Sequence, residues 1–273
     1  MINEAKSNEA HVTNPNLDPK QLAKEFRVSE TLMSNFLDRF APSRVASDEY
    51  RATAEVMLFI HIPKTAGVSV GRSLREAFDH FHGVEWNNIP QSFRQAARSA
   101  IYQQTCRDRR HVIMGHFGWP EMQLFRNHEM PMKCGTILRS PVDRTISNYN
   151  YNCSSAHPAN EQFRKRFPSL ESYISELPTD VQITQALGLI GSFENALEKL
   201  IRHYTFLGVT EHLSASLSHL GRSHGLPKLR EYRENVGMER GEKTLDSELV
   251  KKIENRSFND KRLHSLISRM YQS

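Results

Sequence analysis

Four short runs of apolar residues, each broken off by polar residues or glycine, dominate the pattern of the chain from residue 55 onward. They occupy residues 58–62, 111–114, 134–138 and 205–209. Each run has the length of a buried strand. Segments with helical spacing follow three of them, beginning near residues 69, 141 and 211. Strands that alternate with helices predict an α/β fold with a parallel sheet flanked by helices.

The N-terminal part of the chain follows a different pattern. Residues 1–17 are rich in Asn, Ser and Pro, whereas apolar residues recur at helical spacing between positions 18 and 40. This spacing predicts one or two helices there, and residues 41–54 read as a linker. We therefore predict two parts: residues 1–54 as a polar tail with a helical appendage, and residues 55–273 as the α/β domain.

Two later stretches, residues 153–178 and 221–243, show no clear period, and we expect them to be irregular. Loops of this kind usually carry specificity in α/β proteins. Helices over 245–253 and 259–271 are predicted to close the fold.

The first candidate site is the loop at residues 63–67, which reads Pro-Lys-Thr-Ala-Gly. A strand, a tight loop and a helix in this order point backbone N–H groups and the positive end of a helix dipole at one place, which suits a phosphate. Lys64 adds a charge there, and the hydroxyls of Thr65 and Ser69 add donors. The segment is not a Walker A loop, because it lacks the Gly-Lys-Ser/Thr of that motif. An ordinary strand-to-helix turn with a solvated lysine is the alternative.

The second candidate site begins at Arg139, at the end of the 134–138 run. Ser140 is a suitable N-cap, Pro141 suits the first helical position, and Asp143 would complete a capping box. Open α/β sheets bind ligands at the carboxyl edge. Because Arg139 offers a planar fork of donors, a phosphate is the expected ligand.

Three further residues are weighed against plain structural roles. Arg144 and Ser147 lie three residues apart and share a helix face; we interpret Arg144 as a surface charge, and Ser147 either as a small helix residue or as a ligand contact. The chain contains 13 histidines, most of which must be solvated or structural. His61, inside the first apolar run, is assigned to the structural class.

Two segments together resemble the sulfotransferase family. They read FIHIPKTAGVS at residues 59–69 and LRSPVDRTISNY at residues 138–149. The resemblance is in particular to the carbohydrate branch, which is Golgi-type and heparan 2-O-sulfotransferase-like, and to its bacterial relatives. It implies a P-loop-like α/β fold and the donor 3′-phosphoadenosine-5′-phosphosulfate (PAPS).

The family's binding residues can be carried over position by position. In that family the first loop holds the 5′-phosphosulfate end of PAPS and the second holds its 3′-phosphate. The resemblance assigns the first site to Lys64, Thr65, Ala66, Gly67, Val68 and Ser69. It assigns the second site to Arg139 and Ser147. Relatives often have Thr at the position of Val68 and Asp at that of Ser140, so one hydroxyl donor is missing here.

The family also implies a catalytic base between the two segments. The run 111–114 is followed by Gly115-His116-Phe117-Gly118, and a Gly-His after this strand places the histidine that deprotonates the acceptor hydroxyl. An alcohol is a poor nucleophile until such a base takes its proton. The resemblance therefore implies in-line sulfuryl transfer with His116 as base, Lys64 stabilising the leaving group, and no metal.

The composition of the chain limits the classes of ligand and partner that we expect it to bind. The net charge of +5 favours an anionic ligand such as a nucleotide phosphosulfate or an acidic glycan. No nucleic-acid-reading motif appears. The three cysteines, Cys106, Cys134 and Cys153, lack metal-ligand spacing and are expected to be reduced thiols. We expect PAPS and a hydroxyl acceptor, on a saccharide or glycolipid, as partners.

The expected cellular location rests on the lack of membrane-spanning and signal segments in the sequence. No window approaches the ~20 apolar residues needed to span a bilayer, and the polar N-terminus has no signal core. Because Golgi relatives carry a membrane anchor, we expect a bacterial cytoplasmic enzyme; a protein whose anchor was removed is the alternative.

Two rival functions and two open roles accompany this hypothesis. An ATP-using P-loop kinase is disfavoured by the missing Gly-Lys-Ser/Thr and by the lack of a clear strand-end Asp for magnesium. A non-catalytic nucleotide-binding protein of the same fold is disfavoured by the presence of Lys64, Arg139, Ser147 and His116. The 221–243 stretch either folds over nucleotide and substrate, as in the family, or is a solvated surface. Trp119 is a candidate to stack on a sugar, and Trp86 is expected to pack inside.

Overall fold

A computed structural model describes residues 17–45, 56–103, 109–126, 132–227, 229–232 and 246–272. The predictions for the polar tail, for most of the linker and for Cys106 therefore lie outside the described residues. So does most of the second half of the 221–243 stretch. The two cysteines that are described, Cys134 and Cys153, are free thiols, as predicted.

The described residues form one five-stranded parallel sheet with the order β2-β3-β1-β4-β5. The strands are β1 (Val56–Ile60), β2 (His80–Val84), β3 (His111–Gly115), β4 (Met132–Leu138) and β5 (Phe206–Val209). Four of them confirm the apolar runs of the sequence. The edge strand β2 was not predicted, because its His-Phe-His-Gly-Val sequence is only partly buried and lacks an apolar run.

The register brings the ends of three strands together. Ile60, the last residue of β1, pairs with Gly115 of β3 on one side and with Thr136 of β4 on the other. The segments that follow β1, β3 and β4 therefore leave the sheet side by side at its carboxyl edge. This is where open α/β sheets bind ligands.

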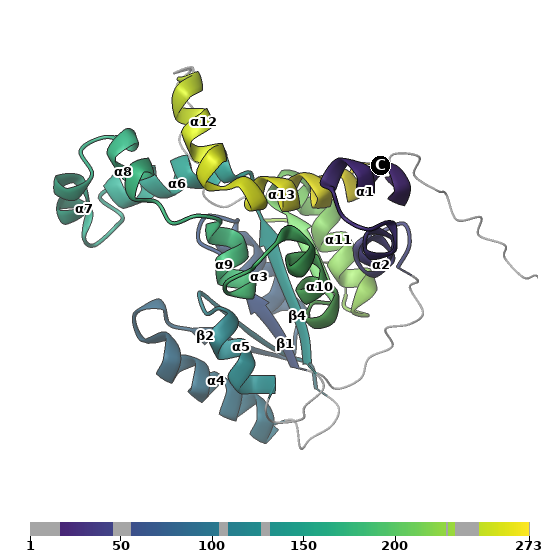
Figure 1. The fold of residues 1–273 in the computed structure, drawn as a ribbon. Helices are drawn as coiled ribbons and strands as arrows, with labels where there is room; N and C mark the ends of the chain where they lie inside the picture. The colour runs from purple at the N-terminus through teal and green to yellow at the C-terminus, as the bar shows by residue number, and fades with distance from the viewer. Residues whose placement is uncertain are drawn as a thin grey trace, which may run out of the picture.

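Helices cover both faces of the sheet (Figure 1). They are α1 (Pro19–Phe26), α2 (Glu30–Phe40), α3 (Gly67–Ala77), α4 (Ile89–Gln103), α5 (Trp119–Arg126), α6 (Pro141–Cys153), α7 (Asn160–Arg166), α8 (Leu170–Glu176), α9 (Val181–Leu187), α10 (Phe193–His203), α11 (Leu213–Ser223), α12 (Ser247–Arg256) and α13 (Phe258–Met270), with 3-10 turns η2 (Trp86–Asn88) and η3 (Thr210–His212). The predicted α/β fold, a parallel sheet flanked by helices, is confirmed.

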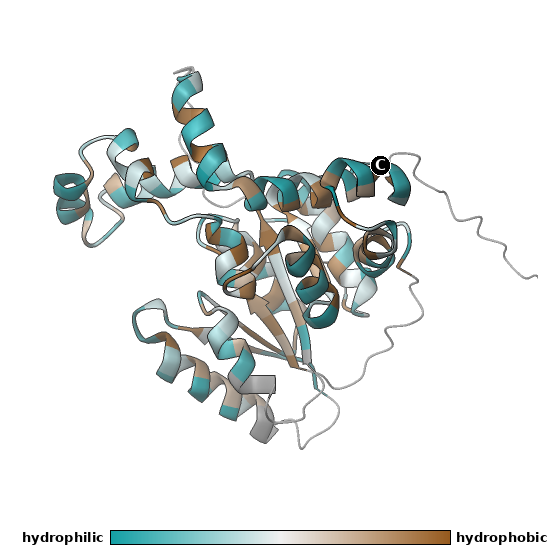
Figure 2. Ribbon diagram, viewed as in Figure 1, coloured by the Kyte–Doolittle hydropathy of each residue, from teal (hydrophilic) through white to brown (hydrophobic). Residues whose placement is uncertain are grey.

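Side chains alternate between two hydrophobic clusters along β1. Leu58 and Ile60 pack with α1, α2, α4, α9, α10 and α13 on one face, whereas Met57 and Phe59 pack with α3 and α11 on the other. The four strands other than β2 are buried on both faces, which explains their continuous apolar runs. Figure 2 shows hydrophobic residues in brown along the central strand β1.

The predicted N-terminal helices form as two separate helices. Asp18 caps α1 and Ser29 caps α2 through side-chain hydrogen bonds. Both helices share the larger hydrophobic cluster with the sheet. Arg39 also donates to the carbonyl of Tyr204 at 3.0 Å, so α2 is tied to the end of α10.

The expectation of an irregular stretch at residues 153–178 was wrong. It contains α7 and α8, which pack with the end of α6 around Phe167, Tyr173 and Leu177 and stand beside the main body (Figure 1). Helices of seven residues are too short to show a clear period. At the C-terminus α12 and α13 confirm the two predicted helices, with bounds within three residues for α12 and within one residue for α13.

No helix among the described residues is long and apolar enough to cross a lipid bilayer.

Candidate active site

The loop between β1 and α3 is shaped mainly by its own residues. Both the hydroxyl and the N–H of Thr65 donate to the carbonyl of Ile62, at 2.8 and 3.3 Å. Lys64 and Ala66 adopt left-handed backbone angles, with φ of 74° and 58°. Such angles are unfavourable for residues other than glycine and tend to occur at functional sites. Helix α3 begins at Gly67, two residues before the predicted start.

Gly67 is required by the close approach of His61. A Cβ atom at position 67 would lie 1.9 Å from Nε2 of His61. The His61 ring also meets the His116 ring edge-on, with 4.7 Å between centroids. Burial, assisted by His116 and Lys64, lowers the pKa of His61 to about 3. His61 is therefore neutral and acts as a packing element beneath the loop, which agrees with the structural role expected for it.

Arg139 connects the two predicted phosphate loops. It follows β4 directly, as predicted, and its Nη1 donates to the carbonyl of Lys64 at 3.2 Å. Its main chain is held by Gln182, whose amide accepts from the Arg139 N–H at 3.0 Å and donates to the Arg139 carbonyl at 2.9 Å.

The Lys64 side chain is half-buried among aromatic and cationic groups. Its Nζ lies 4.2 Å from the centre of the Tyr151 ring. Burial and the positive charge of Arg139 lower the pKa of Lys64. Because two cations stand close together, an anion bound beside them would stabilise the charged form of the lysine.

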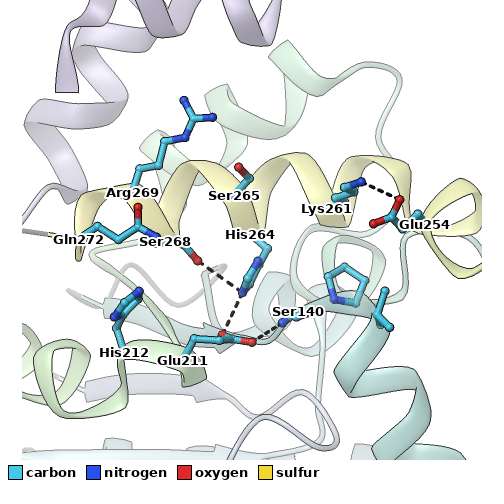
Figure 3. A pocket seen from close by; sticks show the side chains of 12 residues that line it. Ser140, Glu211, His212, Glu254, Lys261, His264, Ser265, Ser268, Arg269 and Gln272 are labelled. Carbon is cyan, nitrogen blue, oxygen red and sulfur yellow. Dashed lines mark hydrogen bonds and ion pairs between the residues drawn. The ribbon is translucent and has the colours of Figure 1, made fainter. Parts of the chain in front are cut away.

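The start of α6 differs from the prediction. Pro141 does occupy the first turn, but within the described part of the chain the Ser140 hydroxyl makes no capping hydrogen bond, so the predicted capping box is absent. Instead, the carboxylate of Glu211 accepts from the Ser140 N–H at 2.7 Å and contacts Nε2 of His264 at 2.9 Å (Figure 3). Burial would raise the pKa of Glu211, but these contacts lower it to about 2.

Two residues further along α6, Arg144 and Ser147, compare differently with the positions predicted for them. Ser147 lies one turn before Tyr151, so it shares the helix face that contacts Lys64. The prediction that Arg144 is a surface charge was wrong, because this side chain is only 3% exposed. Burial lowers the pKa of its guanidinium, while the charge of Asp260 acts in the opposite direction. Helix α6 turns Arg144 inward toward α13. The spacing of apolar residues within α6 alone does not reveal this burial.

His116 stands immediately after β3, beside the Lys64 loop. Its side chain is partly buried, and burial lowers its pKa. Its carbonyl and that of Phe117 lie 3.4 and 3.2 Å from Nε2 of Gln185. The structure thus brings His116, the 63–69 loop and Arg139 to one edge of the sheet.

Comparison with known proteins now decides the family. Residues 50–273 match the model of the sulfotransferase family. The chain belongs to that family. Among solved structures it is similar to mouse sulfotransferase SULT7A1, crystallised in complex with PAP, at 12% identity over 78% of this chain and 69% of that chain, with a TM-score of 0.37. No curated protein sequence matches it.

Two other residues assigned to the first loop, Val68 and Ser69, differ in their exposure to solvent. In this sulfotransferase Ser69 is buried, whereas Val68 is 57% exposed at the start of α3. The position at which relatives often carry a hydroxyl is therefore open to solvent here.

Part of the 221–243 stretch packs on helix α3. The Ser73 hydroxyl donates to the carbonyl of Arg230 at 2.5 Å, and Arg72 lies 4.0 Å from the centre of the Tyr232 ring. Tyr232 also donates to Glu76 of the same helix. The described part of the stretch that contains Arg230 and Tyr232 is thus held beside α3, the helix that follows the Lys64 loop.

The two tryptophans lie in different surroundings. Trp86 is 67% exposed, so the expectation that it packs inside was wrong. Trp119 is partly buried and packs against His203 and Gly188, with Nζ of Lys199 5.3 Å from its ring centre.

A cavity of about 390 Å³ lies between α6, η3 and α13 (Figure 3). Its lining is polar and includes Ser140, Glu211, His212, Lys261 and His264. Lys64, Arg139 and His116 do not line it, whereas Ser140, the residue after Arg139, does.

Several residues that shape the site were not predicted from the sequence: Tyr151, Gln182, Gln185, Glu211 and Asp260. The signal that could have found Gln182 is its place in the otherwise apolar helix Val-Gln-Ile-Thr-Gln-Ala-Leu, where a polar residue on the buried face needs partners.

Proposed function

We propose that this sulfotransferase moves a sulfuryl group from PAPS to a hydroxyl of a saccharide or glycolipid. The observation that carries the proposal is the contact between Arg139 and the Lys64 carbonyl, which joins two cationic loops at the N-termini of α3 and α6. Helix N-termini and paired cations favour phosphate groups.

The first loop would hold the 5′-phosphosulfate end, and Arg139 and Ser147 would hold the 3′-phosphate. Residues 64–69 offer backbone N–H groups from the start of α3 together with the ammonium of Lys64. Arg139 offers a fork of donors from the end of β4. These assignments follow the family resemblance and are supported by the shared edge of the sheet.

The proposed reaction is an in-line displacement at sulfur. As the acceptor oxygen bonds to sulfur, its proton passes to the His116 imidazole, and the bond from sulfur to the phosphate oxygen breaks. Lys64 stabilises the negative charge that grows on the departing phosphate. The lowered pKa of His116 keeps its ring neutral and able to accept a proton near neutral pH.

The heparan 2-O-like branch, a bacterial origin and a cytoplasmic location stay predictions of the resemblance. So does the saccharide or glycolipid nature of the acceptor, because loop shape decides it.

Ligand-induced stabilisation tests the nucleotide assignment. Adenosine 3′,5′-bisphosphate should raise the melting temperature, because a ligand that binds only the native state stabilises it, by about 2.7 kcal/mol at one hundred times its Kd. ATP with magnesium should raise it much less. The reverse order would favour the kinase alternative.

A turnover assay tests the reaction itself. We expect labelled PAPS to transfer its sulfuryl group to at least one member of a panel of bacterial glycans, lipids and phenols. Binding of the bisphosphate without transfer to any of them would favour the non-catalytic alternative.

A further inference from the structure

Helix α9 meets the ends of three strands through two glutamine side chains. Gln182 and Gln185 are three residues apart, so they share one helix face. Gln182 is fully buried and Gln185 is half-buried. Neither belongs to a phosphate loop, yet every strand end of the candidate site has a hydrogen bond to one of them.

Gln182 fixes the main chain of Arg139. Its Oε1 accepts from the Arg139 N–H at 3.0 Å, and its Nε2 donates to the Arg139 carbonyl at 2.9 Å. Both polar groups of one residue are thereby held by a single amide, much as a neighbouring strand would hold them. The backbone from which the Arg139 guanidinium extends is therefore set in one orientation.

Gln185 joins the ends of β1 and β3. Its Nε2 lies 3.1 Å from the carbonyl oxygen of His61, 3.2 Å from that of Phe117 and 3.4 Å from that of His116. The amide has two N–H donors, so three carbonyls share them. One side chain thus links the strand that leads into the Lys64 loop to the segment that carries His116.

The helix that presents these glutamines is itself anchored. The Asp260 carboxylate of α13 accepts from the backbone N–H groups of Gln182 and Ile183, at 3.0 and 2.8 Å. At the other end, the Tyr204 hydroxyl donates to the Ala186 carbonyl at 2.7 Å. Both ends of this short helix are therefore tied to other elements, which keeps the glutamines in place.

We propose that Gln182 and Gln185 are positioning residues that set Arg139 and His116 relative to the Lys64 loop. The inference rests on the proposed function, which gives Arg139 the nucleotide and His116 the acceptor proton. Gln182 acts on nucleotide binding through Arg139, and Gln185 acts on proton transfer through His116. Two variants of one helix should thus affect different kinetic parameters.

Kinetics and calorimetry separate the two roles. Gln185→Leu should lower kcat by about 10- to 100-fold, because small displacements of a catalytic group are costly, while affinity for adenosine 3′,5′-bisphosphate stays nearly unchanged. Gln182→Leu should weaken bisphosphate binding but leave binding of adenosine 5′-phosphosulfate, which lacks the 3′-phosphate, close to wild type. Thr184→Ala, at an exposed position of the same helix, is the matched control and should change neither.

An NMR titration of His116 tests the role of Gln185 without donor or acceptor. In the wild type, burial lowers the pKa of the His116 imidazole. In Gln185→Leu it should move back toward the ordinary value of about 6.5, because the freed segment admits water. An unchanged His116 titration together with unchanged kcat would overturn the positioning role.

A second variant covers the case in which leucine at position 185 prevents folding. Gln185→Glu keeps the size but turns an oxygen acceptor toward three carbonyl oxygens. Its kcat relative to wild type should rise as pH falls, because only the protonated carboxyl can donate. A pH-independent ratio would count against the proposal.

Failure of the two ideas can be told apart. If the wild type neither binds the bisphosphate nor uses PAPS, the proposed function fails, and the His116 titration still judges the link through Gln185. If the wild type does both and the glutamine variants match Thr184→Ala, the positioning role alone is overturned.

Discussion

The two predicted phosphate loops of the candidate site are held in place in different ways. The loop after β1 is stabilised mainly from within, by the two hydrogen bonds from Thr65 to Ile62, and these hold it although Lys64 and Ala66 adopt unfavourable left-handed angles. The turn after β4 is stabilised from outside, since Gln182 holds the main chain of Arg139 and Glu211 holds the N–H of Ser140.

This difference matters for how each loop responds to change. A loop held mainly by its own residues depends on residues close in sequence, so its failures should be local and severe. A turn held by α9 and η3 depends on the packing of distant elements, and the loss of one contact leaves others in place. Among the hydrogen bonds of the described residues, only the one from Arg139 to the Lys64 carbonyl joins the two loops.

The largest effects are expected for the groups that face the reacting atoms. His116→Ala should lower turnover by about 10²–10⁴-fold, the usual cost of losing a general base, while affinity for the bisphosphate stays nearly intact. Lys64→Ala should lower turnover and also weaken bisphosphate binding, because the proposed mechanism gives Lys64 the leaving group. Turnover and calorimetry on both variants check this division; near-normal turnover of His116→Ala would remove it from the catalytic role.

The tight fit under the first loop gives the next largest effect. Gly67→Ala places a Cβ 1.9 Å from His61 Nε2, and overpacking of this severity should cost about 3 kcal/mol or more in the free energy of unfolding. The same substitution should cost much less in a His61→Ala background, where the opposing ring is gone. Denaturant unfolding of the four proteins measures the coupling; additive losses would mean that His61 does not confine Gly67.

Arg139 provides the corresponding test for the second loop. Arg139→Ala should weaken binding of the bisphosphate by about 1.5–3 kcal/mol, typical of a charge-assisted hydrogen bond. Binding of the analogue without the 3′-phosphate should change far less, because the contacts of Gln182 are to the main chain and survive the substitution. Equal losses for both nucleotides in calorimetry would place Arg139 elsewhere.

The same contrast explains what the sequence could predict. The Lys64 loop, the strand before it and the helix after it are fixed mainly by neighbouring residues, so the pattern from Leu58 to Ser69 predicted the strand and the start of the helix to within two residues. The strand that ends at Leu138 and the proline at the start of α6 were likewise predicted, because their signals are local.

The partners of the second loop could not be predicted in this way. Gln182 and Glu211 lie 43 and 71 residues beyond the main-chain groups that they bind, and no spacing rule links them. Arg144 was misjudged for the same reason, because its burial depends on the approach of α13 with Asp260. The edge strand β2 was missed because an edge position tolerates the polar residues that hide its period.

Acid should weaken the first loop before the second. The pKa of His61 is about 3 in the folded protein, chiefly because of burial, against about 6.5 in the unfolded chain. Below pH 6.5 His61 therefore binds a proton in the unfolded chain but not in the folded loop. This difference lowers the free energy of unfolding by up to about 1.4 kcal/mol for each pH unit. The pKa of Glu211 is about 2, so the stability that it contributes persists down to about pH 4.5 and is lost only as pH falls toward 2.

Between pH 6.5 and 5 the opening free energy of residues 67–70 should therefore fall by about 2 kcal/mol, while that of residues 140–144 changes less. Native-state hydrogen exchange, corrected for the intrinsic rates at each pH, measures both. The other buried histidines, His111, His219 and His224, also have lowered pKa values, but their protonation acts through global unfolding and lowers the opening free energy of both segments together. His61→Gln should abolish the difference between the loops. If the difference persists in that variant, the acid sensitivity of the first loop arises from another group.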